Sequence, residues 1–130
     1  MGYMILAATY TDRIETLSFD SDAQSLSITS SLTVGQRPSW ITPHPENPAV
    51  LFTALEQEDG RVVAIEYDKE GKGKVVGDVS SGGAEPCTLV AYKGDLLVGN
   101  VSLALLETTD LVFTGALIIW RVHIVDLRFA

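Results

Sequence analysis

The chain has a single cysteine among its 130 residues, which excludes an internal disulfide. A lone thiol is typical of proteins in a reducing compartment, so a cytoplasmic location is expected. Histidine is almost as scarce, with only His44 and His123. Two histidines and one cysteine show no recognisable ligand spacing, and they leave a Ser-His-Asp triad without a credible base. The sequence therefore predicts neither a metal site nor a catalytic triad.

Positive charge is scarce too. Nine Lys and Arg stand against 17 Asp and Glu, which gives a formal net charge of −8. Because the basic residues are scattered, no stripe is present to replace counterions on a phosphate backbone, and neither nucleic acid nor an anionic membrane is expected as a partner. The longest apolar run, Leu111–Trp120, is too short to span a bilayer. At the N-terminus, Met1–Met4 contains no positively charged side chain and Asp12-Arg13 interrupts the apolar run early, so no secretory leader is expected.

What the chain does contain is a repeat of 48 residues. Two segments return at that offset and a third returns at 46, after a shorter loop: Pro38–Ile41 as Pro86–Leu89, Leu17–Asp20 as Ile65–Asp68, and Val50–Ala54 as Leu96–Asn100. Periods of about 40–50 residues, each holding several short strands, are typical of propeller blades.

Short apolar or alternating segments between turn residues predict the strands. They are Met4–Tyr10, Ile14–Asp20, Ser25–Val34, Pro38–Thr42, Val50–Leu55, Arg61–Tyr67, Lys74–Val79, Thr88–Tyr92, Leu96–Asn100 and Trp120–Phe129. Met4–Tyr10 is almost continuously apolar, which predicts an inner strand covered on both faces. Glu58-Asp59-Gly60 predicts a tight hairpin turn. The fold class is all-β: an incomplete β-propeller with about two four-stranded blades and the two-stranded start of a third.

The repeat is not visible beyond Asn100. We therefore divide the chain into residues 1–100, which form the blades, and a tail of residues 101–130, in which Leu103–Leu106 resembles a helix fragment. One interpretation is translated intron sequence, since Val101-Ser102 can be encoded by a consensus intron start. A genuine short isoform and a divergent third blade are the alternatives. The apolar tail is expected to collapse onto the blades, with Trp120–Phe129 pairing with an open sheet edge.

Arg37 and Glu85 stand in equivalent loops, each before a proline that begins a strand. They are the candidate substrate-binding residues, because the planar guanidinium of Arg37 suits a carboxylate. The alternative is that both charges only brace neighbouring blades. His44 lies between two prolines and is interpreted as a loop residue, and Cys87 as a buried small side chain without a cation to activate it. No catalytic residue is assigned.

Four segments resemble the N-terminal part of the lactonase family of seven-bladed β-propellers, most closely its fungal members. They are Ala7–Asp12, Arg37–Ile41 with His44-Pro45, Asp59–Val62 and Ser81–Cys87. The family includes phosphogluconolactonases and carboxy-cis,cis-muconate cyclases. It usually has glycine where Ala8 stands, and it continues after Asn100 with an aromatic residue where this chain has Val101.

The resemblance implies a reaction that opens or closes a lactone ring without a metal or a redox cofactor. The implied partner is a small-molecule lactone or carboxylic acid, bound once the complete propeller forms. Because the family's acid and base residues come from later blades, none maps onto this sequence, and the chain alone is expected to be inactive. The alternative function is a non-catalytic fragment that binds protein. Self-association through exposed blade edges is expected in either case.

Overall fold

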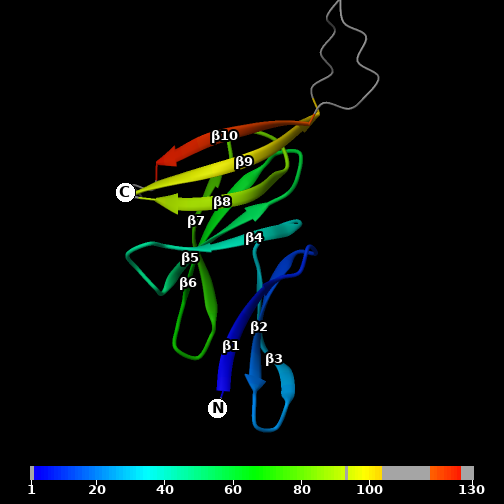
Figure 1. The fold of residues 1–130 in the computed structure, drawn as a ribbon, viewed down its shortest axis with the longest axis vertical. Coiled ribbons are helices and arrows are strands. Elements are labelled where there is room, and N and C mark those ends of the chain that lie inside the picture. Colours follow the sequence, from blue (N-terminus) through cyan, green and yellow to red (C-terminus); the bar gives the residue numbers. More distant parts are fainter. Residues whose placement is uncertain (1, 93, 104–117, 127–130) are drawn as a thin grey trace, which may run out of the picture.

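The computed structural model describes residues 2–92, 94–103 and 118–126, and every regular element in them is a β-strand. Figure 1 shows the strands gathered into three sheets that follow one another along the molecule. In chain order the strands are β1 (Gly2–Ala8), β2 (Arg13–Asp20), β3 (Ser25–Thr33), β4 (Pro38–Pro43), β5 (Val50–Leu55), β6 (Arg61–Tyr67), β7 (Gly73–Ser80), β8 (Pro86–Tyr92), β9 (Asp95–Leu103) and β10 (Ile118–Asp126). The chain is all-β in its described residues, as the sequence predicts.

Each sheet is antiparallel, and each corresponds to one blade. Their strand orders are β1-β2-β3, β4-β5-β6-β7 and β10-β9-β8. Irregularities in the pairing recur 48 residues apart, between Thr16 and Leu17 and again between Ala64 and Ile65. A repeated bulge at the same place in two sheets shows that the sequence repeat is also a structural repeat. The arrangement is that of a partial propeller.

The blades are held face to face by two apolar clusters. Between the first and second sheets, Ile14 of β2 packs with a set from β5 and β6: Leu51, Leu55, Val63, Ile65 and Tyr67. Between the second and third sheets, Phe52 and Ala54 pack with Leu89, Leu96 and Val98. Because β5 and β6 have alternate side chains in the two clusters, the second sheet is covered on both faces. This explains why the apolar character of β5 is nearly continuous.

A buried polar contact fastens the loop after β7 to β9. The Ser81 hydroxyl donates to Asn100 Oδ1 at 2.7 Å, and Asn100 Nδ2 donates to the Ser81 carbonyl at 3.1 Å. Both residues are fully buried. The Ser81 amide also donates to the Gly60 carbonyl at 2.8 Å. A Cβ on Gly60 would overlap Ser81 Oγ and the Gly83 carbonyl, so glycine is required here for close approach.

The prediction that Met4–Tyr10 is covered on both faces is wrong. Met4 and Ile5 are 54% and 43% exposed, and the strand ends at Ala8. The reason is that β1 is the edge strand of the first sheet, and within the described residues only one face of that sheet meets another blade. The opposite face exposes several large apolar side chains: Tyr3, Ile5, Leu26 and Ile28. Self-association through this sheet stays a prediction.

The offset of 46 for the third repeated segment is also wrong, by one residue. Pro38 pairs with Leu55 and Pro86 pairs with Asn100, so Leu55 corresponds to Asn100 at an offset of 45. Apolar runs look alike when shifted by one residue, although such a shift moves every side chain to the other face. The expected tight turn at Glu58-Asp59-Gly60 is instead a five-residue connection between β5 and β6.

The third sheet has three strands, one more than the sequence predicts. Strand β10 pairs with the edge of β9 through nine residue pairs, from Ile118 with Leu103 to Asp126 with Asp95. This confirms that the tail pairs with an open edge. Leu103 belongs to β9 rather than to a helix, while the rest of the expected helix fragment, residues 104–106, lies outside the described residues. The domain boundary at Asn100 stays a prediction.

Candidate functional site

Arg37 and Glu85 share an unusual backbone conformation. Their φ angles are 53° and 51°, in the left-handed region that residues with a Cβ seldom adopt. Each precedes a buried proline, Pro38 or Pro86, that begins a strand. A conformation of this kind costs about 1–3 kcal/mol and persists only where the surrounding structure enforces it.

Hydrogen bonds on both sides enforce this conformation. The Arg37 amide donates to the Thr11 carbonyl at 2.7 Å, and the Arg37 carbonyl accepts from the Glu56 amide at 2.9 Å. In the next blade, the Glu85 amide donates to the Gln57 carbonyl at 2.8 Å, and its carbonyl accepts from the Val101 amide at 3.1 Å. The same loop is therefore built twice, and it joins each blade to the one before.

The side chains of Arg37 and Glu85 are half-buried, and within residues 2–92, 94–103 and 118–126 they have no hydrogen bond or ion pair. Two charges of opposite sign thus occupy equivalent positions in neighbouring blades, on backbones that are fixed. Rigid support of an uncommitted charged side chain is what a binding site needs. The two residues predicted from the sequence, Arg37 and Glu85, therefore lie in the same loop of two successive blades.

These positions lie at the inner edge of the blades. Strand β4 is the edge strand of the second sheet and β8 that of the third, and each begins directly after its left-handed residue. Figure 1 shows β4 lying between β8 and β1, and β4 makes contacts with both. In a propeller the innermost strands surround the central channel. Arg37 and Glu85 therefore stand at the end where β4 and β8 begin, which a complete propeller would place at one mouth of its channel, and we call this end of the two strands the mouth.

Two further residues belong to this site and were not predicted from the sequence. Tyr10 and Glu56 each lie two residues after the corresponding Ala8 and Ala54, so they occupy equivalent places in the first two blades. The Tyr10 hydroxyl donates to Glu56 Oε1 at 3.3 Å, from one blade to the next. An offset of 46 residues between β1 and β5 relates these two residues, and it is visible in the strand pairing rather than in the residue types.

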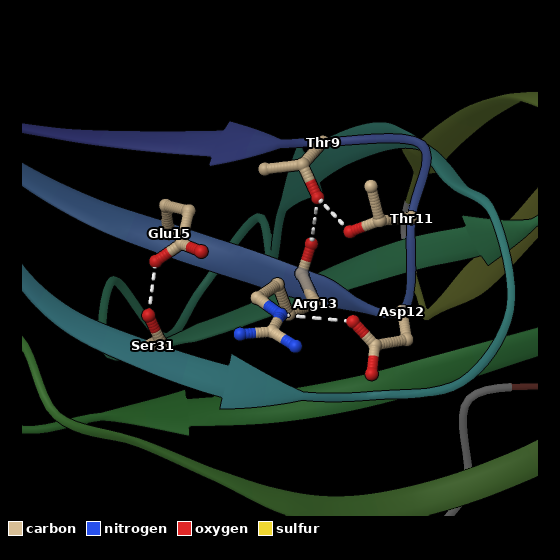
Figure 2. A network of polar contacts seen from close by, with 6 residues as sticks. All are labelled: Thr9, Thr11, Asp12, Arg13, Glu15 and Ser31. Carbon is tan, nitrogen blue, oxygen red and sulfur yellow. Dashed lines mark hydrogen bonds and ion pairs between the residues drawn. The ribbon is translucent and has the colours of Figure 1, made fainter.

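The turn that carries Tyr10 is fixed by its own polar contacts, which Figure 2 shows. The Thr9 hydroxyl donates to the Arg13 carbonyl at 2.8 Å and lies 2.7 Å from the Thr11 hydroxyl. Arg13 Nε lies 2.8 Å from Asp12 Oδ1, and this guanidinium lowers the pKa of the Asp12 carboxyl. Nearby, Ser31 donates to Glu15 across β2 and β3. Tyr10 itself has a φ of 60°, so a third left-handed residue is held at this mouth.

Cys87 follows Glu85 and Pro86 and is half-buried rather than fully buried. Burial raises the pKa of its thiol, and the negative charge of Glu56 raises it further. Thiolate formation is therefore disfavoured, in agreement with the prediction that Cys87 is not a nucleophile.

His44 does not join the site. It follows β4, at the end opposite to Arg37, and its Nδ1 accepts the amides of Glu46 and Asn47 at 3.1 and 3.0 Å. Its ring lies 5.7 Å from that of Phe52, measured between centroids. The interpretation of His44 as a loop residue is confirmed. His123 lies within β10, and its side chain is outside the described set.

A shallow open depression of about 590 Å³ lies beside the site, and its charge is mainly negative. Its charged lining residues are Glu58, Asp59, Asp78 and Arg61, and Arg61 Nε is paired with Asp78 Oδ1 at 2.9 Å. A hollow with three carboxylates and one neutralised arginine does not suit an anionic ligand. The depression is therefore a weaker candidate than the mouth itself.

Two findings concern other classes of site. Among the residues that the structure describes, no three His, Cys, Asp or Glu side chains are grouped so as to hold a metal ion. In the same part of the chain, no helix has the length and apolar character needed to cross a membrane.

Comparison with known proteins agrees with this geometry. The profile of the family "Lactonase, 7-bladed beta-propeller" matches residues 4–117, most of the chain. No curated protein matches. A solved structure of a candidate 6-phosphogluconolactonase from Bacteroides fragilis is similar, with a TM-score of 0.69 and 21% identity over 78% of this chain and 30% of that one. A second, from Bacteroides uniformis, has a TM-score of 0.62 and 21% identity over 72% and 28%. This chain thus spans less than a third of either neighbour, and it belongs to the lactonase family of seven-bladed β-propellers.

Proposed function

We propose that the chain forms part of the wall of a site that opens or closes a lactone ring. The observation that carries the proposal is the repeated left-handed loop that presents Arg37 and Glu85 at one mouth of the propeller. Membership of the lactonase family and the likeness to two candidate 6-phosphogluconolactonases support the class of substrate. A small-molecule lactone, or the acid that it yields, is the proposed ligand.

The chemistry suits the two side chains. Hydrolysis of a lactone adds water to the ester carbonyl and breaks the ring C–O bond, with no change of oxidation state, so the proposed reaction needs no redox cofactor. A guanidinium such as that of Arg37 binds the carboxylate product and stabilises negative charge on the carbonyl oxygen. A carboxylate such as that of Glu85 is suited to accept hydrogen bonds from the ligand. We propose that no metal takes part, which predicts that a chelator leaves ligand binding unchanged.

The 130-residue chain alone is not expected to turn over substrate. It spans about 30% of the length of the propellers it resembles, and a site of converging side chains needs the blades that surround it. Whether the complete site hydrolyses a sugar lactone or cyclises a muconate-type acid is left open by the family. A cytoplasmic setting belongs to the same proposal.

The second candidate function is a protein-binding module. It is favoured by the apolar face of the first sheet, where Leu26 and Ile28 are 59% and 62% exposed. Such a face buries readily against another protein surface. A stable complex formed through it, combined with no affinity for lactones or sugar acids, would favour this reading.

The experiment is a binding titration of the chain with D-gluconate, the ring-opened product of a simple sugar lactone. Arg37→Ala should weaken binding about tenfold, which corresponds to about 1.4 kcal/mol for the lost charge-assisted contact. Lys69→Ala is the control, since it removes an exposed cation that follows β6 at the end of the second sheet opposite to Arg37. Equal effects of the two substitutions, or no detectable binding by the chain, would refute the proposal.

A further inference from the structure

The chain makes the same contact between blades twice. In each contact the forward face of one sheet, which meets the sheet that follows it in the chain, packs against the rear face of that following sheet. The first sheet contributes Leu6 and Ile14 to such a contact, and the second contributes Phe52 and Ala54. Strand pairing makes Leu6 equivalent to Phe52, at the offset of 46 residues between β1 and β5. One kind of apolar contact therefore joins both pairs of neighbouring blades.

The rear face of the first sheet has the same apolar pattern, and no other sheet covers it in the described part of the chain. Ile5 and Leu17 pair across β1 and β2, and they are equivalent to Leu51 and Ile65, which are buried against the first blade. Ile5 is nonetheless 43% exposed. Six large apolar side chains share this rear face: Tyr3, Ile5, Leu17, Phe19, Leu26 and Ile28. The face is therefore suited to receive the forward face of another blade.

The third sheet presents a forward face that is open in the same sense. The pairing of β8 with β9 makes Leu97 equivalent to Phe52, and Val90, which pairs with Leu97, is 53% exposed. The forward face of each sheet has a large apolar residue followed two positions later by a small one: Leu6 and Ala8, Phe52 and Ala54, Leu97 and Gly99. The third sheet thus repeats the surface that the first two sheets use to hold the next blade.

The two open faces are the complementary halves of one contact. They belong to the first and third sheets, which lie at opposite ends of the molecule with the second sheet between them (Figure 1). A symmetric contact between two rear faces would leave both forward faces open, whereas a head-to-tail contact covers all four. Head-to-tail contacts either close into a ring or continue as a filament. Two copies with three sheets each supply six blades, within the range of about four to eight found in propellers, and three copies exceed that range.

We propose that a second copy of this chain covers the rear face of the first sheet with its own third sheet, and that the two copies close head to tail into a ring of six blades. The occupant follows from continuity with the contacts inside the chain, because the third sheet of a second copy has the forward face that this rear face matches. In the ring, Arg37 and Glu85 of both copies surround one channel. The assembly itself does not depend on which ligand binds at the mouth.

The first experiment measures the mass of the full chain by light scattering after size exclusion, over a wide range of concentration. The ring predicts a limiting mass of about 28 kDa, twice the 14.0 kDa of the chain. Ile5→Glu on the rear face and Val90→Glu on the forward face should each return the mass to that of one copy, because each places a charge in both contacts of the ring. Val76→Glu is the matched control and should leave the mass unchanged, since Val76 is exposed on β7 of the second sheet, whose two faces are already covered.

The second experiment mixes the two variants in equal amounts. Ile5→Glu keeps an intact forward face and Val90→Glu an intact rear face, so one contact of a mixed pair is unaltered. Native mass spectrometry should therefore detect a pair that contains one copy of each variant. Far-ultraviolet circular dichroism checks that the separate variants are folded. If a glutamate variant unfolds, Ile5→Thr and Val90→Thr repeat the test, because threonine retains the preference for strands.

Three results would overturn the inference. A mass of one copy at every concentration is expected if a different protein or the tail of the same chain covers the rear face. A mass that grows without limit as concentration rises would show an open filament in place of the ring. Loss of association in Ile5→Glu but not in Val90→Glu, with no mixed pair, would show that two rear faces meet each other.

Discussion

Replacing Asn100 by alanine should destabilise the chain by about 2–4 kcal/mol. The side chain is fully buried and makes two hydrogen bonds with Ser81, at 2.7 and 3.1 Å. Each bond contributes about 1 kcal/mol net, and the buried Ser81 carbonyl loses this donor at a cost of about 1–3 kcal/mol. The Ser81 hydroxyl keeps a partner, the Gly83 carbonyl at 2.9 Å, which limits the loss. For a domain stable by about 5–15 kcal/mol, this is a large fraction.

Urea unfolding followed by far-ultraviolet circular dichroism measures the effect. Asn47→Ala is the matched control, since Asn47 is exposed and its side chain accepts a local bond from the Ala49 amide at 3.1 Å. The control should cost about 0.5–1 kcal/mol, within the usual range for a single hydrogen bond. If Asn100→Ala costs no more than the control, the contact between Ser81 and Asn100 does not hold the third blade, and the reasoning fails.

Three further predictions follow from single buried or crowded groups. Gly60→Ala should lower stability by about 1–3 kcal/mol, because its Cβ would overlap Ser81, and an unchanged melting temperature would contradict the close approach. Burial raises the pKa of Tyr67 from 10.0 to about 12, so the chain should lose stability as pH rises from about 10 to 12. Tyr67→Phe should flatten this loss and cost little at neutral pH, since the buried hydroxyl has no partner among the described residues, and a pH profile identical to that of the unchanged chain would count against the assignment. Glu56→Gln should speed alkylation of Cys87 at a fixed pH below the thiol pKa, because a charge that raises this pKa is removed, and an unchanged rate would show that the two groups are not neighbours.

The repeat made most of the fold predictable. Strands β5 and β6 have the predicted limits, Val50–Leu55 and Arg61–Tyr67, because clear turn residues bound them. The register of the third repeat was not predictable, since an almost unbroken apolar run contains no alternation to fix it. The exposure of β1 was also missed, because apolar character shows that a strand can be buried and does not show whether a neighbouring blade is present.

The site was predictable only in part. Arg37 and Glu85 were found because each precedes a proline at the same place in its repeat. The left-handed conformation was not foreseen, since a charged residue before proline is normally extended. Tyr10 and Glu56 were missed because they differ in chemistry, so a search for repeated residue types passes over them. Their relation depends on strand pairing, which only the structure shows.

The measurement that tests the central claim most directly is a titration of the isotopically labelled chain with D-gluconate, followed by amide chemical shifts. The account predicts that the largest shifts fall on Arg37 and Glu85 and on the strand starts that follow them. The acidic depression beside Asp59 and Asp78 should remain unchanged. Shifts centred on that depression, or spread evenly over the exposed face of the first sheet, would contradict the claim that the repeated left-handed loops form the ligand site.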